Sequence, residues 1–376
     1  MSTQQSARLG VDAALRNARV IVCCGSGGVG KTTTAAALAL RAAEQGRRTV
    51  VLTIDPARRL AQSMGLAELD NLPSRVAGVD GELDAMMLDM KRTFDEIVLA
   101  HSDPERARQI FANPFYQSLS SSFAGTQEYM AMEKLGQLVA ERRWDLVVVD
   151  TPPTRSALDF LDAPKHLGKF LDGRVIKVLV APARAGGRAY LKVVNAGLAA
   201  VTRVMTRIIG AQVLTDVQQF VASLETMFGG FRDRADQTYQ MLAAPGTAFV
   251  VVATPEAAAL REASFFTERL ASEGMPLAGV VVNRLHPVDG VFADDGVGAA
   301  RTIAAAEELE AAGTHPETAA LLRLHAERAT LARREAALVE RFSRAHPGTP
   351  ITPVPAFPED IHDLDGLRAI GAALAG

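Results

Sequence analysis

The sequence predicts an α/β fold built on a doubly wound, mostly parallel sheet, with an α-helical subdomain inserted into it. Short β-branched runs recur along the 376 residues and alternate with long helical stretches. Most of the runs contain a continuous apolar stretch, which is typical of strands buried on both faces of a parallel sheet. Asp55, Asp150 and Asn283 stand where three of the runs end. Ligands bind at the carboxyl ends of such strands, so these residues are candidates for a binding site.

Seven runs are expected to form the strands. The first leads into a glycine-rich loop and an alanine-rich helix, and the others follow at intervals that leave room for crossover helices. Residues 99–142 and 157–246 hold helical patterns without a strand, and we expect them to form the inserted subdomain. Residues 286–313 predict a loop and a surface helix, and residues 314–344 a long, charged, exposed helix. The expected strands lie within 18–24, 47–55, 82–89, 143–150, 247–253, 277–283 and 348–355.

Length and composition set the outer limits of the protein. With 48% hydrophobic residues and a formal net charge of −3, the chain can bury a large core, and we expect residues 1–376 to form one domain that carries the insert. The mild acidity predicts no nucleic-acid partner. Neither a signal peptide nor an uncharged stretch of about 20 residues is visible. We therefore expect a cytoplasmic protein, and leave contact with a membrane surface open.

The two cysteines, Cys23 and Cys24, are adjacent on the first expected strand. Neighbouring strand residues point to opposite faces, so a disulfide between them is disfavoured. We interpret both as small buried hydrophobic residues of an intracellular protein.

The glycine-rich loop carries the most specific pattern in the chain. The stretch from Gly25 to Thr32, GSGGVGKT, fits G-x-x-x-x-G-K-[ST] between a strand and a helix. Glycines let successive backbone N–H groups turn inward towards phosphate oxygens, and the helix that follows adds its positive end. Lys31 then reaches the β- and γ-phosphates, and the Thr32 hydroxyl joins the shell of a Mg²⁺ ion. The expected nucleotide contacts are Gly27, Gly28, Val29, Gly30, Lys31, Thr32 and Thr33.

Two strand-end carboxylates complete this prediction. Asp150 closes the run LVVVD and is expected to hold Mg²⁺ together with Thr32 and Asp55. Asp55, in TIDPARRL, can orient the attacking water, and with Lys31 it makes up the expected catalytic pair. The alternatives are an ordinary strand-end aspartate at 150 and a turn-forming Asp-Pro pair at 55. ATP and Mg²⁺ are thus the expected substrate and cofactor.

Seven motifs, in order, resemble the family of the arsenite-pump ATPase and of the ATPase that targets tail-anchored membrane proteins. They are GGVGKTTT, TIDPA, GTQEYMA, VVVDTPPT, PEAAALREA, VVVN and PAFPEDIHDLDGL. The resemblance is strongest to bacterial members described as anion-transporting ATPases. It implies a P-loop ATPase that closes as a nucleotide-sandwich dimer on ATP and opens after hydrolysis. It also implies that the dimer handles a hydrophobic client or a membrane partner.

The resemblance assigns roles to further residues. Asp55 matches the first switch aspartate, which polarises water, and Asp150 matches the second switch. Asn283 matches an asparagine that reads adenine, and Pro355 to Phe357 match the loop that lies against the base. From its own position alone, Asn283 is only a strand-end amide.

One departure from the family concerns Ser26. The family has a lysine immediately before the paired glycines, which crosses the dimer to the partner's phosphates, and here that position is Ser26. Three readings stay open. In the first, an arginine of this chain supplies the charge. In the second, a lysine-bearing paralogue supplies it in a heterodimer. In the third, the charge is absent, and the site binds ATP but hydrolyses it poorly. Candidate substitutes are Arg58, Arg59 and Arg155.

The metal chemistry of the two named branches is not expected here. The tail-anchored branch binds zinc between subunits through C-x-x-C, a motif that this chain lacks. A soft metalloid such as arsenite needs several cysteines at one site, and two adjacent strand thiols cannot supply them. We therefore expect neither zinc nor arsenite pumping.

Two apolar stripes at helical spacing lie inside the second helical segment. They run from Leu191 to Ile208 and from Val217 to Phe231, beside a basic stretch between Gly173 and Thr215. Packing within the subdomain is one interpretation. A groove for an apolar helix that opens with nucleotide state is another, and contact with a membrane surface is a third.

Three functions follow from these observations. The first is an ATPase, as a homodimer or a heterodimer with a paralogue, that couples closure to handling a hydrophobic helical client or membrane protein. The second is a nucleotide-binding regulatory or scaffold subunit with weak turnover, which the serine at position 26 suggests. The third, a partition-type ATPase, fits poorly because the C-terminal DLDGLRAIGAALAG holds one basic residue.

Overall fold

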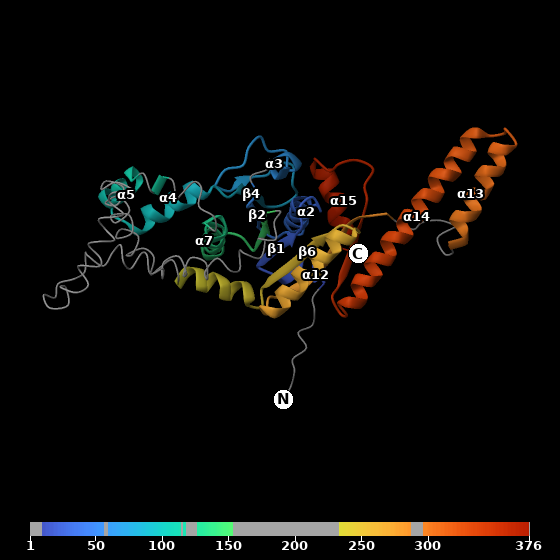
Figure 1. The fold of residues 1–376 in the computed structure, drawn as a ribbon. Helices are drawn as coiled ribbons and strands as arrows, with labels where there is room; N and C mark the ends of the chain where they lie inside the picture. The colour runs from blue at the N-terminus through green and yellow to red at the C-terminus, as the bar shows by residue number, and fades with distance from the viewer. Residues whose placement is uncertain are drawn as a thin grey trace, which may run out of the picture.

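The computed structural model describes residues 10–55, 59–113, 116–117, 126–152, 233–286 and 296–375. Its centre is an eight-stranded sheet with the strand order β3-β4-β2-β5-β1-β6-β7-β8 (Figure 1). Every pairing is parallel except that of β3 with β4, so the predicted fold class is confirmed. The strands are β1 Val20–Gly25, β2 Thr49–Thr53, β3 Ser74–Arg75, β4 Leu83–Met87, β5 Leu146–Asp150, β6 Thr247–Ala253, β7 Leu277–Leu285 and β8 Ile351–Pro355.

All seven expected strands form, with several ends that differ from those expected. Strand β7 continues to Leu285, so Asn283 lies two residues before its end. Strand β2 ends at Thr53, so Asp55 lies in the loop beyond it. Strand β4 ends at Met87, and Asp89 instead caps the next helix by accepting a hydrogen bond from the backbone N–H of Arg92. Strand β3 was not predicted, because a two-residue edge strand is too short to show a period.

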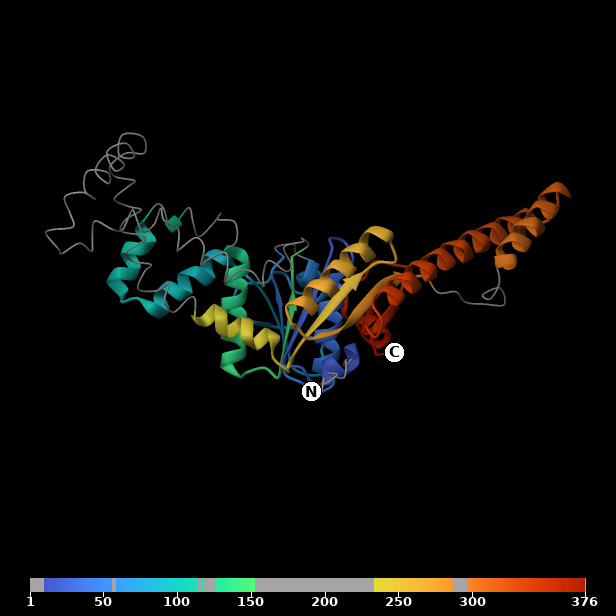
Figure 2. The ribbon, with the colours of Figure 1, turned by 60° about the horizontal axis from the view of Figure 1, so that its bottom comes forward.

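Helices cover both faces of the sheet. In a right-handed crossover, the face that the helix covers depends on the direction in which the chain adds successive strands across the sheet. The chain moves one way from β1 to β4, with α2 and α3, and returns through β5 to β8, with α7, α12 and α14 on the other face (Figure 2). The helices are α1 Val11–Asn17, α2 Lys31–Glu44, α3 Arg59–Ser63, α4 Met90–His101, α5 Pro104–Ala112, α7 Thr126–Glu141, α12 Ala257–Ser272, α13 Gly296–Ala311, α14 Pro316–Ala345 and α15 Leu364–Ala373.

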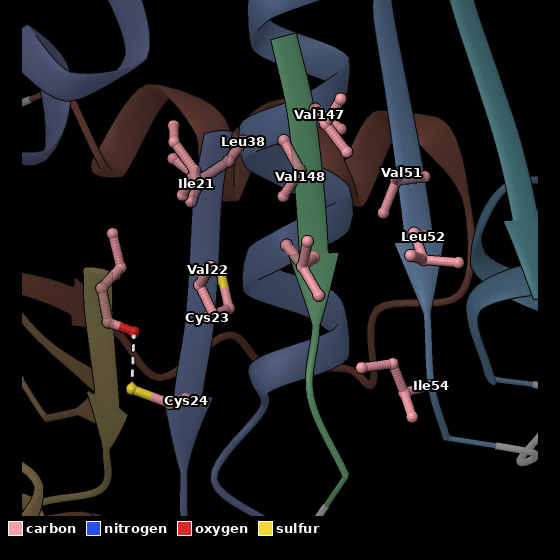
Figure 3. Close-up of a cluster of buried hydrophobic side chains, with 14 of the residues drawn as sticks. Ile21, Val22, Cys23, Cys24, Leu38, Val51, Leu52, Ile54, Val147 and Val148 are labelled. Carbon is pink, nitrogen blue, oxygen red and sulfur yellow. Dashed lines mark hydrogen bonds between the residues drawn. The ribbon is translucent and has the colours of Figure 1, made fainter. Parts of the chain in front are cut away.

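The core lies where α2 crosses β1, β5 and β2. Ile21 and Val22 on β1 pair with Val148 and Val149 of β5, and Leu38 of α2 belongs to the same buried cluster (Figure 3). Six of the 14 residues of α2 are buried alanines, which let the helix approach the sheet closely, and α15 packs against α2 as well. This packing fixes the helix whose first residue is Lys31.

The predicted helical insert is described only in part. Helices α4, α5 and α7 hold most of the described residues between 99 and 142, and residues 116–117 are helical as well. Of the second segment, 157–246, only 233–246 are described, and 233–243 are helical. The stripes at 191–208 and 217–231 lie outside the described residues. The division into one domain with a two-segment insert stays a prediction.

Helices α13 and α14 form a hairpin that projects from the body at the end opposite α4 and α5 (Figures 1 and 2). Both were expected as surface helices, and α14 extends over 30 residues. No helix in the described part of the chain is both long and apolar enough to cross a membrane.

Candidate functional site

The glycine loop takes the path that its spacing predicts, from the end of β1 to the start of α2. Gly25 has φ +151°, and a Cβ there would lie 2.1 Å from the carbonyl oxygen of Val252 on β6. Gly28 and Gly30 have φ +79° and +93°, in the region that favours glycine. The loop therefore curls between two strands at points where a side chain would clash or strain the backbone.

Lys31 is the first residue of α2, and its side chain folds back over the loop. Its Nζ donates a hydrogen bond of 2.7 Å to the carbonyl oxygen of Ser26, and the residue is only 5% exposed. Burial lowers the pKa of Lys31, and the nearby Asp150 carboxylate opposes that shift. A buried ammonium is thus held at the mouth of the loop before any phosphate arrives.

Asp150, at the end of β5, is fully buried and accepts two hydroxyl hydrogen bonds on one oxygen. Thr32 Oγ1 donates to Oδ2 at 2.7 Å and Thr53 Oγ1 at 2.9 Å. The other oxygen, Oδ1, is buried and has no hydrogen-bond partner among the residues that the structure describes. Burial raises the pKa of Asp150 to about 6, although the two hydroxyls and Lys31 pull it down.

This arrangement fits the predicted magnesium site. An unpartnered carboxylate oxygen in the interior is costly unless a cation or water satisfies it. Hard oxygen donors, such as the carboxylate of Asp150 and the hydroxyl of Thr32, are those that Mg²⁺ prefers. The two residues are brought together from β5 and α2, 118 positions apart in sequence.

Asp55 lies half-buried in the loop after β2, near enough to Lys31 to act on its charge. Its backbone N–H donates to Thr53 Oγ1 at 3.2 Å, and the preceding carbonyl of Ile54 accepts from Gln127 Nε2 at 3.0 Å. Gln127 belongs to α7, so this loop is tied both to the sheet and to the helical segment. Sequence reasoning missed Thr53 and Gln127, although Gln127 lies within the GTQEYMA motif.

Asn283 contacts the back of the glycine loop. Its Nδ2 donates to the carbonyl oxygen of Val29 at 2.9 Å, and a Cβ at Gly30 would lie 2.2 Å from that nitrogen. Its Oδ1 accepts from the backbone N–H of Arg284 at 3.0 Å. The amide therefore links the end of β7 to the phosphate-binding loop in this structure, and its contact with adenine stays a prediction.

The other expected adenine contacts lie beside Asn283. Pro355 ends β8 and pairs with Leu285 of β7, whose carbonyl accepts from the backbone N–H of Ala356 at 2.9 Å. Phe357 is half-buried and packs against the core. The ends of two neighbouring strands thus bring together residues 283 and 355–357.

The candidate substitutes for the missing lysine are only partly described. Arg59 begins α3 and is exposed. Arg58 and Arg155 lie outside the described residues. Thr33 is half-buried in the first turn of α2, and Gly27 lies within the loop itself.

Both cysteines are free and buried, as predicted. Cys24 Sγ donates to the carbonyl oxygen of Val250 at 3.7 Å (Figure 3), and the carbonyl of Cys23 accepts from Thr151 Oγ1 at 2.8 Å. Burial raises the pKa of Cys24 to about 12 and that of Cys23 well above its ordinary value. Thiols in this state are poor metal ligands, because the ligand is the thiolate.

Comparison with known proteins adds the following. A family model described as "Anion-transporting ATPase" matches residues 18–292. "ATPase ASNA1 homolog 1" of Paramecium tetraurelia is 32% identical over 148 residues, which are 39% of this chain and 44% of that relative. "ATPase GET3" of Podospora anserina is 26% identical over 273 residues, 72% of this chain and 74% of the relative. A "Putative arsenical pump-driving ATPase" of Halobacterium salinarum is 32% identical over 177 residues, 45% of this chain and 27% of the relative.

Proposed function

Since the chain belongs to the anion-transporting ATPase family, we propose that it binds Mg-ATP in its glycine loop and hydrolyses it. One observation carries the proposal. The buried carboxylate of Asp150 keeps Oδ1 unpartnered while Thr32 and Thr53 hold Oδ2. Lys31 lies close enough that its ammonium stabilises the same carboxylate.

Each residue has a separate part in the proposed reaction. Backbone N–H groups of the loop and the amino end of α2 bind the phosphates, and Lys31 moves from the Ser26 carbonyl to the β- and γ-oxygens. Thr32 and Asp150 hold Mg²⁺, which neutralises charge on the phosphates when it is bound. Asp55 accepts a proton from the attacking water. Thr53 orients both Asp150 and the Asp55 backbone.

Asp55→Asn is expected to keep Mg-ATP binding and to lose about 10²-fold or more in turnover. The amide preserves the shape of the side chain but is a far poorer proton acceptor. Binding is measured by calorimetry and turnover by phosphate release. Turnover within about threefold of the parent would mean that Asp55 only shapes the Asp-Pro turn.

ATP binding is further proposed to close a dimer that handles a hydrophobic helical client or a membrane partner. Support comes from the family and from the geometry around Asp55. The hydrogen bond from Gln127 to the Ile54 carbonyl joins the γ-phosphate end of the site to α7. A shift of the Asp55 loop on hydrolysis is thereby transmitted to the helical segment. Whether the dimer is homomeric or contains a paralogue depends on what replaces the charge at position 26.

A second candidate is a nucleotide-binding regulatory or scaffold subunit with weak turnover. Ser26 favours it, because a homodimer has no lysine at this position on either side. An equivalent arginine finger contributes about 10³–10⁵ in rate in other phosphoryl-transfer enzymes, so its loss would be easily measured.

Ser26→Lys separates the two candidates. We expect the isolated chain to hydrolyse ATP with a charge of its own, so the added lysine changes turnover by less than about threefold. Arg58→Ala, Arg59→Ala and Arg155→Ala, made singly, then identify the arginine by the large loss that one of them causes. A slow parent whose turnover the lysine raises about tenfold or more would favour the regulatory subunit.

A further inference from the structure

Helix α14 carries a heptad seam along one side. Seven positions recur at alternating steps of three and four residues, a spacing that brings them to a single face and is typical of coiled coils. Five of the seven are apolar. The positions are Leu321, Leu324, Arg328, Leu331, Glu335, Leu338 and Phe342.

The half of this seam nearest the body is already covered. Phe342 is 4% exposed within the main core, and Leu338 packs against that core. Glu335 is buried and accepts a hydrogen bond of 2.9 Å from the backbone N–H of His286, just after β7. Here the seam is an established interface between α14 and the α/β body.

The distal half of the same seam is uncovered. Leu321, Leu324 and Leu331 are 66%, 50% and 41% exposed. Helix α13 does not cover them, because it packs against a different side of α14, where Ala319 and Ala326 are buried. One seam, apolar except at Arg328 and Glu335, therefore passes from the core of the protein into solvent.

Charge along the hairpin of α13 and α14 is unevenly distributed. Residues 302–322, around its tip, hold four glutamates and no lysine or arginine. Residues 328–344, towards its base, hold five arginines and two glutamates. Arg323 lies between the two regions and pairs with Glu310 at 2.6 Å. This pair neutralises one of the four glutamates, so the tip keeps a net negative charge.

We propose that the uncovered seam binds the same seam of a second copy of this chain, antiparallel, so that the two hairpins form a four-helix bundle. An antiparallel arrangement sets the acidic tip of each hairpin against the basic base of the other. A parallel arrangement would bring acid to acid and base to base. This arrangement places Leu321 of one copy opposite Leu331 of the other, as a and d positions meet in antiparallel coiled coils. The same register sets Leu324 against the aliphatic stem of Arg328, whose guanidinium reaches solvent at the edge of the contact.

This contact is separate from the nucleotide-sandwich dimer and does not depend on the proposed function. The glycine loop lies at the carboxyl end of β1, whereas the seam lies on the projecting hairpin. The protein is therefore expected to self-associate through α14 without nucleotide.

Sedimentation of the nucleotide-free chain tests the proposal. The parent should be dimeric, and the triple change of Leu321, Leu324 and Leu331 to Glu should raise the dissociation constant about 100-fold or more. The matched control changes Leu72 and Leu99 to Glu, two leucines with 51% and 58% exposure away from the hairpin. Circular dichroism and the unfolding temperature show whether each variant folds. A monomeric parent overturns the proposal, and so does a triple variant that is folded and still dimeric.

Cysteine cross-linking tests the direction of pairing. Both native cysteines are buried, so Leu321→Cys and Leu331→Cys each introduce one accessible thiol. An antiparallel pair should cross-link in a mixture of the two variants but not within either alone. The like thiols are then about ten residues apart along the axis, roughly 15 Å, and a disulfide needs Cα atoms within about 7 Å. Cross-links between two copies of the same variant, with none that join the two different variants in the mixture, would overturn the antiparallel arrangement.

Discussion

Lys31→Ala is expected to lower ATP hydrolysis strongly and to weaken Mg-ATP binding by about 10- to 100-fold. The binding loss follows from a charge-assisted contact of about 1.5–3 kcal/mol with the β- and γ-phosphates. The loss in turnover is larger, about 10²–10³-fold, because the ammonium also stabilises the charge that develops in the transition state. Calorimetry measures binding, and phosphate release measures turnover.

Lys31→Met is the matched control, because it keeps most of the side-chain volume and removes only the charge. In the free protein the Lys31 ammonium is buried and bonded to the Ser26 carbonyl, so its desolvation opposes its single hydrogen bond. The Met variant should therefore unfold at a temperature close to that of the parent while losing ATP binding like the Ala variant. Unchanged Mg-ATP affinity in both variants would contradict the assignment of the glycine loop.

Asp150→Asn is expected to stabilise the ligand-free protein above pH 7 and to remove its Mg-dependent hydrolysis. Burial raises the pKa of Asp150 from 3.8 to about 6, so ionising this carboxylate in the folded protein costs roughly 3 kcal/mol. The amide carries no charge and keeps an oxygen that can accept from Thr32 and Thr53. It cannot replace the anionic oxygen that Mg²⁺ needs.

The sign of the pH effect follows from proton binding. Between about pH 3.8 and 6 the folded state holds the Asp150 proton more tightly than the unfolded state, so this residue lowers stability as pH rises through that window. Above about pH 6 the destabilisation caused by the Asp150 carboxylate reaches its full value. The unfolding free energies of the parent and of Asp150→Asn should therefore agree most closely near pH 4 and diverge towards pH 7.5. Denaturant unfolding at both pH values measures the difference.

Asp145→Asn, one residue before β5, is the control with the opposite sign. Hydrogen bonds from Arg48 lower the pKa of Asp145 to about 2, so its carboxylate contributes stability that is present above pH 4 and lost as pH falls towards 2. The Asn variant should thus be no more stable than the parent at pH 7.5. If Asp150→Asn also lowers stability at pH 7.5, the Asp150 carboxylate is better satisfied in the free protein than its unpartnered oxygen indicates.

Much of the sheet was predictable because parallel strands buried on both faces leave a local signal. The stretches 20–24, 146–149 and 248–253 are apolar throughout, and the structure places each in a central strand. The order of the strands has no such signal. It depends on which runs meet in space, and the antiparallel edge strand at 74–75 is too short to show any period.

The residues of the candidate site likewise fall into those that a local pattern marks and those that it does not. Lys31, Thr32 and Asp150 were predictable because a fixed spacing or a strand end marks each of them. Thr53 and Gln127 were missed, since each acts through a partner distant in sequence: Asp150 for Thr53 and the Ile54 carbonyl for Gln127. Such contacts carry no pattern in one sequence.

The hairpin shows another limit of sequence patterns. Periodicity predicted α14 as a long surface helix, and that prediction is confirmed. Several sides of this helix have apolar residues at heptad spacing, and the pattern alone does not say which of them meets α13, the body or solvent.

The position of β1 at the centre of the sheet has a consequence for biosynthesis. Its neighbours are β5 and β6, and Val20 pairs with both Val147 and Thr247, so the strand that leads into the phosphate loop emerges from the ribosome long before its partners. At about 5–20 residues per second, the wait for β6 is on the order of 10–50 s. Both edges of β1 are unpaired until β5 emerges, and the edge that β6 covers stays unpaired for the whole of that time. Nascent chains truncated before residue 247 should therefore recruit chaperones and fail to retain nucleotide, whereas chains extended past Asn283 should retain it.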